Sequence, residues 1–172
     1  GAFVIGDLGD VEILAEARWL LAQSGPLAGR KLVVTAGGTQ EPIDPVRAIT
    51  NRSSGKQGFA LAQAALDLGA TVTLISGPSA LVEPVGVQRV NIHTAQEMLQ
   101  AVTAHLPAAD ALLMAAAVAD FRPAAPADQK IKKENGVPKI GLAKNPDILA
   151  EVAKVKTAKG HPEVVVGFAA ES

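Results

Sequence analysis

Residues suited to binding an anion are concentrated in the segment 49–66, which reads ITNRSSGKQGFALAQAAL. Ser53, Ser54 and Gly55 come directly before a predicted helix, and the unpaired amides at the N-terminus of a helix favour an anion. The spacing differs from that of a P-loop, because the Gly55-Lys56 pair is followed by glutamine rather than by serine or threonine. It also differs from the Gly-x-Gly-x-x-Gly spacing of dinucleotide-binding loops. Two interpretations stay open: a phosphate site, or a helix that Ser53 or Ser54 simply caps.

The approach to this helix is long. Residues 36–55 separate the predicted strand 31–35 from the helix, whereas strand-to-helix loops in α/β units are commonly about 2–6 residues long. Gly37 and Gly38 lie early in this segment and, having no Cβ, allow backbone amides to come close to a ligand. A loop of this length in a compact domain is typical of a functional site, which favours the phosphate interpretation.

Asn51 and the arginines on either side of it could bind oxygen-rich groups. Arg47 and Arg52 could clamp a phosphate or a carboxylate, although most surface arginines are simply solvated. Asn51 carries no charge and both donates and accepts hydrogen bonds, so it suits an acyl or phosphoryl oxygen that gains charge during a reaction. Asparagine in a loop is also a common turn former, and the residues alone leave that interpretation ahead.

Further polar candidates follow the predicted strand 111–118. Asp120 would lie at the carboxyl end of this strand, where an acid can bind ribose hydroxyls or a metal ion. Phe121 could pack against a base or cover the edge of the sheet. The segment 129–136, QKIKKENG, has lysines at positions 130, 132 and 133. It is either a solvated charged face or a flap that closes over polyphosphate.

A second helix N-terminus offers another candidate phosphate site. Asn145 is the predicted N-cap of this helix, with Pro146 in the first turn and the cation of Lys144 directly before it. The three histidines share no spacing that would indicate a metal or catalytic site; they are His93, His105 and His161.

Strands and helices alternate along the chain. The predicted strands are 31–35, 70–76, 88–92, 111–118 and 163–169. The predicted helices are 11–23, 59–68, one that opens at a Thr94-Glu97 capping box, and one from 145 to about 155. This alternation predicts an α/β fold that is Rossmann-like, three-layered and doubly wound, with a mainly parallel sheet. Ligands of such sheets bind at the carboxyl ends of the strands.

The length of 172 residues suits one main domain, expected at 29–172 after an N-terminal connector helix and linker at 1–28. The chain ends three residues after its last predicted strand, so we expect the last C-terminal elements of this domain to be missing. The net charge of −1 argues against nucleic acid or anionic lipid as a partner. With no cysteine there is no thiolate chemistry, and no apolar run reaches membrane-spanning length. A cytoplasmic protein is expected.

Five motifs occur in the order found in one enzyme family: TAGGTQEPIDPVRAITNRSSGKQG, AAAVADFRP, KIKK, KNPDIL and VVGFAAE. On these motifs, from about Arg30 to Glu171, the chain resembles bacterial phosphopantothenoylcysteine synthetases. Those enzymes form one half of a bifunctional coenzyme A biosynthesis protein, and the other half is a decarboxylase that carries FMN. The helix at 11–23 is similar to the connector between the halves. The resemblance implies ligation of 4′-phosphopantothenate to cysteine through an acyl-cytidylate, with CTP and Mg²⁺, in a homodimer.

The resemblance also implies roles for individual residues. Asn51 would hold the acyl-cytidylate, Lys130 would contact nucleotide and intermediate from a flap, and Arg47 would bind the phosphate of phosphopantothenate, across a dimer interface. Asp120 would meet the ribose, and Phe168 would lie near the base. The other nucleotide-binding residues implied are Gly37, Gly38, Ser53, Ser54, Gly55, Met114, Ala115, Ala116, Phe121, Lys144, Asn145, Pro146, Asp147, Ile148 and Leu149. The Mg²⁺ ligands are left open.

Two alternatives belong to other classes. An NAD(P)-dependent oxidoreductase on the same fold would require a compact glycine loop and an acidic residue near the end of the second strand. That strand ends in ISGPS, which contains no acidic residue. A non-catalytic nucleotide-binding module would bind CTP without turning it over. A site of amides, lysines, arginine and one asparagine suits nucleotide activation of a carboxylate, which depends on positioning and charge stabilisation.

Overall fold

The computed structural model describes residues 9–132, 134 and 136–169. Three parts of the sequence-based predictions lie outside these residues: Lys133 of the basic segment, Glu171 at the end of the last motif, and the first eight residues of the expected connector. None of the described helices is long and apolar enough to cross a membrane.

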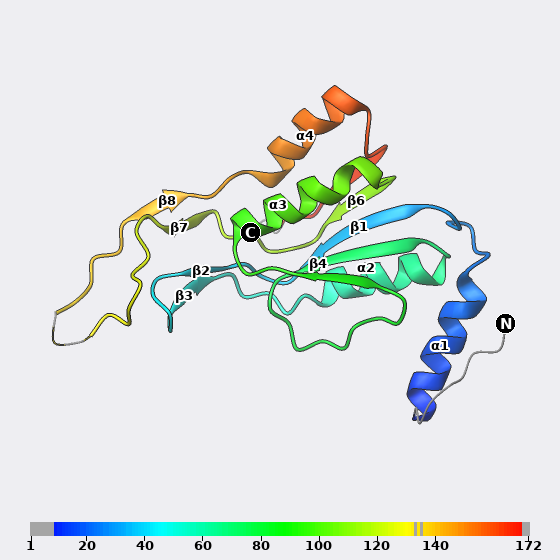
Figure 1. Cartoon of the computed structure of the whole chain (residues 1–172), viewed down its shortest axis with the longest axis horizontal. Helices are drawn as coiled ribbons and strands as arrows, with labels where there is room; N and C mark the ends of the chain where they lie inside the picture. The colour runs from blue at the N-terminus through cyan, green and yellow to red at the C-terminus, as the bar shows by residue number, and fades with distance from the viewer. Residues whose placement is uncertain (1–8, 133, 135, 170–172) are drawn as a thin grey trace.

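The core of the molecule is a five-stranded parallel sheet (Figure 1). Its strands, in spatial order, are β5 (Gln88–Asn91), β4 (Thr71–Ser76), β1 (Lys31–Ala36), β6 (Ala111–Met114) and β9 (Val164–Gly167). Each neighbouring pair is parallel. The predicted doubly wound α/β fold is therefore confirmed. The direction of winding reverses between β1 and β6, and ligands of such sheets bind at that reversal.

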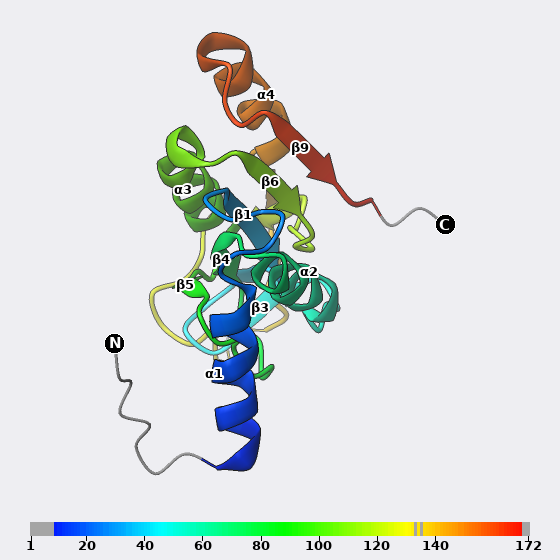
Figure 2. The same ribbon diagram turned by 90° about the vertical axis from the view of Figure 1, so that its right-hand side faces the viewer.

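Helices cover both faces of the sheet (Figure 2). Alternate residues of one strand point to opposite faces, so Val33 packs with helices α3 (Ala95–His105) and α4 (Ile148–Lys159), while Val34 packs with α2 (Lys56–Asp67). The α2 helix approaches β1 closely because Gly58 faces it; a Cβ on Gly58 would lie 2.5 Å from the Cβ of Ala36. The helix α1 (Asp10–Ala22) packs on the α2 side through Trp19. A 3-10 turn, η1 (Leu106–Ala108), follows α3.

The sequence did not predict two antiparallel hairpins of three-residue strands. The segment 36–55, predicted as an uninterrupted loop, contains β2 (Gln40–Pro42) paired antiparallel with β3 (Ala48–Thr50). In the same way β7 (Phe121–Pro123) pairs with β8 (Leu142–Lys144). Three residues are too few to show an alternating pattern, so the sequence carries no strand signal there. The two hairpins lie together at one end of the molecule, where β2 contacts β7 (Figure 1).

The strand predicted at 111–118 is too long, because β6 ends at Met114. Beyond it the chain turns to cross the end of β1: Ala116 donates its amide to Thr35 Oγ1 at 3.1 Å, and Ala117 donates to the carbonyl of Gly37 at 2.8 Å. The apolar run therefore continues past the strand that it predicts. The last strand is also shorter than predicted, at Val164–Gly167.

Asp110 fastens the amino-terminal end of the sheet. Its carboxylate accepts hydrogen bonds from the Lys31 amide at 2.7 Å and from Arg30 Nη1 at 3.0 Å, which joins β6 to the start of β1. These bonds, with the Lys31 amide contributing most, hold the pKa of Asp110 below its usual value.

Replacing Asp110 by asparagine is expected to lower the melting temperature at pH 7. Since the pKa is lower in the folded than in the unfolded protein, the carboxylate stabilises the fold above the unfolded value, and this stabilisation is lost as the pH falls through the folded value. The melting temperatures of wild type and Asp110→Asn should therefore converge as the pH is lowered from 7 towards 3. Asp128→Asn, at an exposed position, is the control. A difference that stays constant with pH would contradict the assignment.

Candidate functional site

The loops that follow β1 and β6 are fastened to each other at the reversal point of the sheet. Thr39 is buried; its Oγ1 accepts the amide of Ala119 at 3.0 Å, and its own amide donates to the Ala117 carbonyl at 3.3 Å. Together with the bonds that Thr35 Oγ1 and the Gly37 carbonyl accept from Ala116 and Ala117, these contacts fix the backbone after β6. This fixed segment forms one wall of a pocket.

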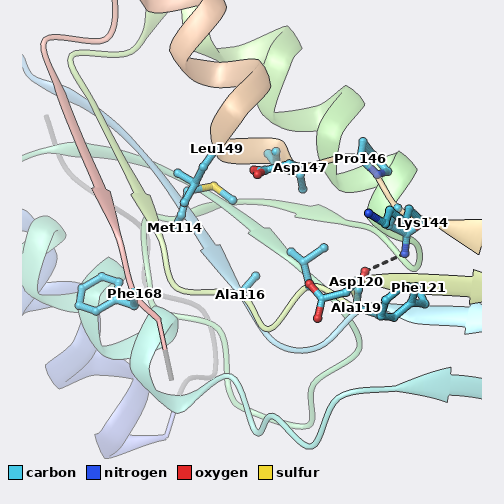
Figure 3. A pocket seen from close by; sticks show the side chains of 13 residues that line it. Met114, Ala116, Ala119, Asp120, Phe121, Lys144, Pro146, Asp147, Leu149 and Phe168 are labelled. Carbon is cyan, nitrogen blue, oxygen red and sulfur yellow. Dashed lines mark hydrogen bonds between the residues drawn. The ribbon is translucent and has the colours of Figure 1, made fainter. Parts of the chain in front are cut away.

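The pocket has a volume of about 590 Å³ (Figure 3). It lies between the segment that follows β6, the start of α4 and the end of β9. It is lined by Met114, Ala116, Val118, Ala119, Asp120, Phe121, Lys144, Asn145, Pro146, Asp147, Ile148, Leu149 and Phe168. In the view of Figure 3, Met114 and Leu149 lie together at one end, and Asp120, Phe121 and Lys144 lie at the other.

The structure brings together eleven residues that the sequence reading assigned to nucleotide binding, from three separate stretches of chain. The sequence reading missed Val118 and Ala119, which carry no chemical signal of their own; their place between Ala116 and Asp120 was the available clue. Ala115 was predicted but does not line the pocket.

Asn145 holds the start of α4 against the opposite wall. Its Nδ2 donates to the carbonyl of Ala119 at 2.8 Å, and its backbone amide donates to the carbonyl of Asp120 at 2.8 Å. Arg122, which the sequence reading also missed, donates to the carbonyl of Lys144 and, at 3.3 Å, to Asn145 Oδ1. These bonds close the polar end of the pocket.

The predicted cap of α4 is therefore wrong. The N-cap is Asp147, whose Oδ1 accepts the amide of Ala150 at 3.0 Å, and the helix runs from Ile148 to Lys159 rather than from 145 to about 155. The side chain of Asn145 is engaged across the pocket and does not cap the helix. A carboxylate at this helix start offsets part of the attraction for a phosphate that the free amides and Lys144 would exert.

Asn51 lies at the border of this pocket rather than among its lining residues. Its Nδ2 donates to the carbonyl of Val118 at 3.1 Å, and Val118 does line the pocket. The preceding Thr50 donates its hydroxyl to the carbonyl of Thr39 at 2.8 Å, which fixes the end of β3 beside the loop after β1. One amide hydrogen of Asn51 is thus used for positioning, and the side chain remains exposed.

The serines before α2 do not line the pocket, and neither is the N-cap of the helix. The cap is Gly55, with φ of 79°. Ser53 Oγ accepts the amide of Gly55 at 3.3 Å, and Ser54 Oγ accepts the amide of Lys56 at 3.4 Å. Both serines therefore satisfy amides near the helix start. An anion at this N-terminus would have to displace these weak internal contacts.

The glycines predicted to approach a ligand have a packing role in the structure. A Cβ on Gly38 would lie 2.8 Å from the carbonyl oxygen of Asn51, and a Cβ on Gly77 would lie well inside van der Waals distance of the Gly38 carbonyl oxygen. Gly37, with φ of 75°, adopts the left-handed conformation that side chains disfavour. Three chain segments thus meet at a spacing that only glycine permits.

Arg47 and Lys130 do not line the first pocket. They line a second hollow of about 870 Å³, at the hairpin end of the molecule. Its other lining residues are Ile131, Lys132, Glu134, Gly136, Val137 and Pro138. Arg47, expected to bind the substrate phosphate, thus lies beside Lys130, expected to contact nucleotide and intermediate, and both lie apart from the other residues expected to bind nucleotide that line the first pocket.

Carboxylates and imidazoles do not converge on a metal site: within the described part of the chain, no group of three or more His, Cys, Asp or Glu side chains is placed to hold a metal ion. Asp120 and Asp147 are the carboxylates that line the first pocket.

Comparison with known proteins identifies the family. Residues 27–172 match the model of the DNA/pantothenate metabolism flavoprotein C-terminal domain. The chain belongs to this family. The family relationship predicted from the motifs is therefore confirmed.

Curated relatives in the family are bifunctional proteins of coenzyme A biosynthesis. The chain is 57% identical over 150 residues to the coenzyme A biosynthesis bifunctional protein CoaBC of Mycobacterium tuberculosis (strain ATCC 25618 / H37Rv), covering 85% of this chain and 36% of the relative. It is 48% identical over 180 residues to CoaBC of Vibrio vulnificus (strain YJ016), covering 100% of this chain and 44% of the relative. The chain spans less than half the length of these relatives.

Solved structures have the same fold. The C-terminal domain of a CoaBC protein superposes with a TM-score of 0.70 at 43% identity, covering 83% of this chain and 65% of that one. A Cab2 mutant in complex with phosphopantothenate-cysteine superposes with a TM-score of 0.60, covering 95% of this chain and 80% of that one. At 15% identity the second similarity shows the fold alone.

Proposed function

We propose that this chain forms the nucleotide-binding part of a ligase that joins 4′-phosphopantothenate to cysteine in coenzyme A biosynthesis, with CTP as the activating nucleotide. The observation that carries the proposal is the pocket at the reversal point of the sheet, whose lining unites the three motif segments expected to bind nucleotide. The names of the curated relatives, CoaBC proteins of coenzyme A biosynthesis, support the same pathway.

The proposed reaction has two displacement steps. A carboxylate oxygen of phosphopantothenate attacks the α-phosphorus of CTP, and pyrophosphate leaves with the electrons of the broken P–O bond. The amine of cysteine then attacks the acyl carbon of the acyl-cytidylate, loses a proton, and CMP leaves. Both steps require aligned reactants and stabilised oxygen charge, and neither requires a nucleophile from the protein.

Residues in different parts of the pocket would contact different parts of the nucleotide. The backbone of 114–116 and Phe168 would hold the base, Asp120 would accept hydrogen bonds from the ribose, and residues 144–149 would lie along the phosphates. Asn51, fastened to the pocket wall through Val118, would donate to the acyl or phosphoryl oxygen that gains charge. In the second hollow, Arg47 and Lys130 would bind the phosphorylated end of the other substrate.

Mg²⁺ would enter with the nucleotide. This ion is commonly bound by substrate phosphates, waters and one or two carboxylates rather than by a complete set of protein ligands. The pocket supplies two carboxylates, Asp120 and Asp147, on its walls, which fits that donor set. When bound, Mg²⁺ would neutralise polyphosphate charge; the chain's own residues orient the nucleotide.

The remaining parts of the proposal concern the longer protein. Its relatives are bifunctional, and the family is named for a flavoprotein, so we assign FMN to the part outside this domain, which begins near residue 29 after the connector. A homodimer and a cytoplasmic location complete the proposal.

Nucleotide preference tests this function. We expect CTP with Mg²⁺ to raise the melting temperature of the chain more than ATP, GTP or NAD at equal concentration, because a ligand that binds only the folded state stabilises it by about 2.7 kcal/mol at a hundred times its Kd. Asp120→Asn should reduce the CTP shift, and Asp128→Asn, outside the pocket, should leave it unchanged. The measurement is a thermal denaturation series.

Other results of the denaturation series would favour a different function or nucleotide. A larger shift with NAD would contradict the ligase and support an oxidoreductase. A larger shift with ATP would keep the ligase and overturn the predicted nucleotide. CTP binding without cysteine-dependent release of CMP in the longer protein would indicate a non-catalytic binding module.

A further inference from the structure

Asp44 is a buried carboxylate in the turn between β2 and β3. Its side chain has no solvent exposure, whereas that of its partner Arg47 is 44% exposed. Asp44 Oδ1 accepts the amides of Val46 and Arg47, both at 2.9 Å, which fixes the turn. Asp44 Oδ2 accepts the Arg47 guanidinium through Nε, at 3.0 Å, and through Nη2. The proposed reaction does not involve this acid directly.

The same carboxylate reaches a segment far away in the sequence. Asp44 Oδ2 also accepts the amide of Ile131 at 3.1 Å, and Arg47 Nη2 donates to the carbonyl of Ile131 at 2.9 Å. Asp44 and Arg47 thus bind both the backbone amide and the backbone carbonyl of Ile131. A third bond, from the Ala127 amide to the Ile43 carbonyl at 2.9 Å, docks the segment a few residues earlier.

Ile131 is the residue between Lys130 and Lys132. Both lysines line the 870 Å³ hollow, and so does Arg47. The hydrogen bonds to Ile131 therefore position Lys130 and Lys132 relative to Arg47. Glu134 is the one acidic residue among the described lining residues, against the three cations Arg47, Lys130 and Lys132. The hollow is therefore predominantly cationic and suits a phosphate group.

We propose that Asp44 is a positioning residue that holds the Lys130–Lys132 stretch and the Arg47 guanidinium in one arrangement, so that three cations line the same hollow. The assignment of a phosphorylated substrate to this hollow rests on the proposed function; the positioning by Asp44 does not. Asp44 itself is buried behind Arg47 and does not need to touch the substrate.

The contact pattern requires a carboxylate. Both oxygens of Asp44 accept hydrogen bonds, two backbone amides on one and a guanidinium with a third amide on the other. An asparagine has one oxygen, so its NH₂ group would face donors on the other side and leave them unsatisfied. The hydrogen bonds from Arg47, then those from backbone amides, hold the pKa of Asp44 far below its usual value against the opposing effect of burial, so the group stays charged at neutral pH.

Amide hydrogen exchange of the Ile131 N–H tests the proposal without any ligand. In Asp44→Asn we expect this amide to exchange roughly tenfold faster or more than in the wild type, while the Val34 amide in β1 is unchanged. Asp128→Asn, an exposed acid in the same docked segment, should leave Ile131 unchanged. Unchanged exchange at Ile131 in a folded Asp44→Asn protein would overturn the proposal.

A second variant covers the case in which Asp44→Asn fails to fold. Arg47→Lys keeps a cation at an exposed side chain but removes the planar donor pair that joins Asp44 to the Ile131 carbonyl. Exchange at Ile131 should again rise by roughly tenfold. Protection equal to that of the wild type would overturn the proposal.

Kinetics of the longer protein separate positioning from general destabilisation. In Asp44→Asn we expect the KM for 4′-phosphopantothenate to rise about tenfold, with a smaller change in the KM for cysteine. A fall in kcat with both KM values unchanged would overturn the positioning role. If the wild type shows no ligation, the proposed function fails, and the exchange result still decides the role of Asp44.

Discussion

Replacing Asn51 by aspartate is expected to reduce kcat for ligation by about 10²–10³-fold in the longer protein, the range found when one donor to a developing oxyanion is removed. The substitution keeps the size of the side chain and removes both amide hydrogens. One of these hydrogens fixes the side chain on the Val118 carbonyl at 3.1 Å. The new carboxylate would instead face that carbonyl and repel the anionic intermediate. Steady-state kinetics with CTP, phosphopantothenate and cysteine would measure the loss.

The control for this variant is Asn91→Asp. Asn91 ends β5 at the edge of the sheet, is exposed like Asn51, and lies in neither of the hollows described above. It receives the same chemical change, so kcat should stay within about twofold of the wild type, as for surface substitutions away from special features. Since Asn51 is exposed, Asn51→Asp should also melt close to the wild type. Wild-type turnover in Asn51→Asp would contradict the role assigned to the side chain.

The main sheet was predictable because its strands carry strong local patterns. The β-branched run at Lys31–Ala36 and the capping box at Thr94 and Glu97 each appear in the structure where the sequence indicates them. Each of these signals is contained within a few consecutive residues. The two three-residue hairpins lack such a signal, since their strands form through partners that the local sequence does not specify.

The candidate site was predictable as separate segments but not as an assembly. Asp120 and the 144–149 stretch were expected to bind one nucleotide, yet the bonds that join these segments, from Asn145 to the carbonyls of Ala119 and Asp120, depend on the folded chain. The sequence Asn-Pro-Asp was predicted to cap the helix through Asn145. The tertiary acceptor on Ala119 engages the asparagine, so the aspartate caps the helix. For the same reason Arg122, which bridges the two segments, gave no signal in the sequence.

Gly77→Ala is expected to destabilise the protein by about 3 kcal/mol, the upper part of the usual range for overpacking a tightly packed site. Gly77 follows β4, and its Cα faces the loop after β1. A Cβ there would lie well inside van der Waals distance of the Gly38 carbonyl oxygen and 3.5 Å from the Gly38 nitrogen. The nearest atoms belong to backbone, so no side-chain rotation can relieve the clash.

The Gly38 backbone cannot move away freely, because its other side is also occupied. A Cβ on Gly38 would lie 2.8 Å from the Asn51 carbonyl oxygen, so the Gly38 backbone already lies against Asn51. The strain at Gly77 is therefore transmitted to the loop that carries Asn51, and we expect nucleotide-dependent stabilisation to fall along with the melting temperature. Gly141→Ala is the matched control, since its nearest neighbour would be the Ala124 Cβ at 4.0 Å.

For a chain of this length a loss of about 3 kcal/mol corresponds to a melting temperature roughly 6–12 °C lower, whereas Gly141→Ala should melt close to the wild type. Thermal denaturation of both variants, with and without CTP and Mg²⁺, measures stability and ligand response in one series. If Gly77→Ala melts like the wild type, the segments of Gly77, Gly38 and Asn51 are not packed as described. If it is destabilised but keeps the full CTP shift, the packing at Gly77 supports the fold without positioning the loop of Asn51.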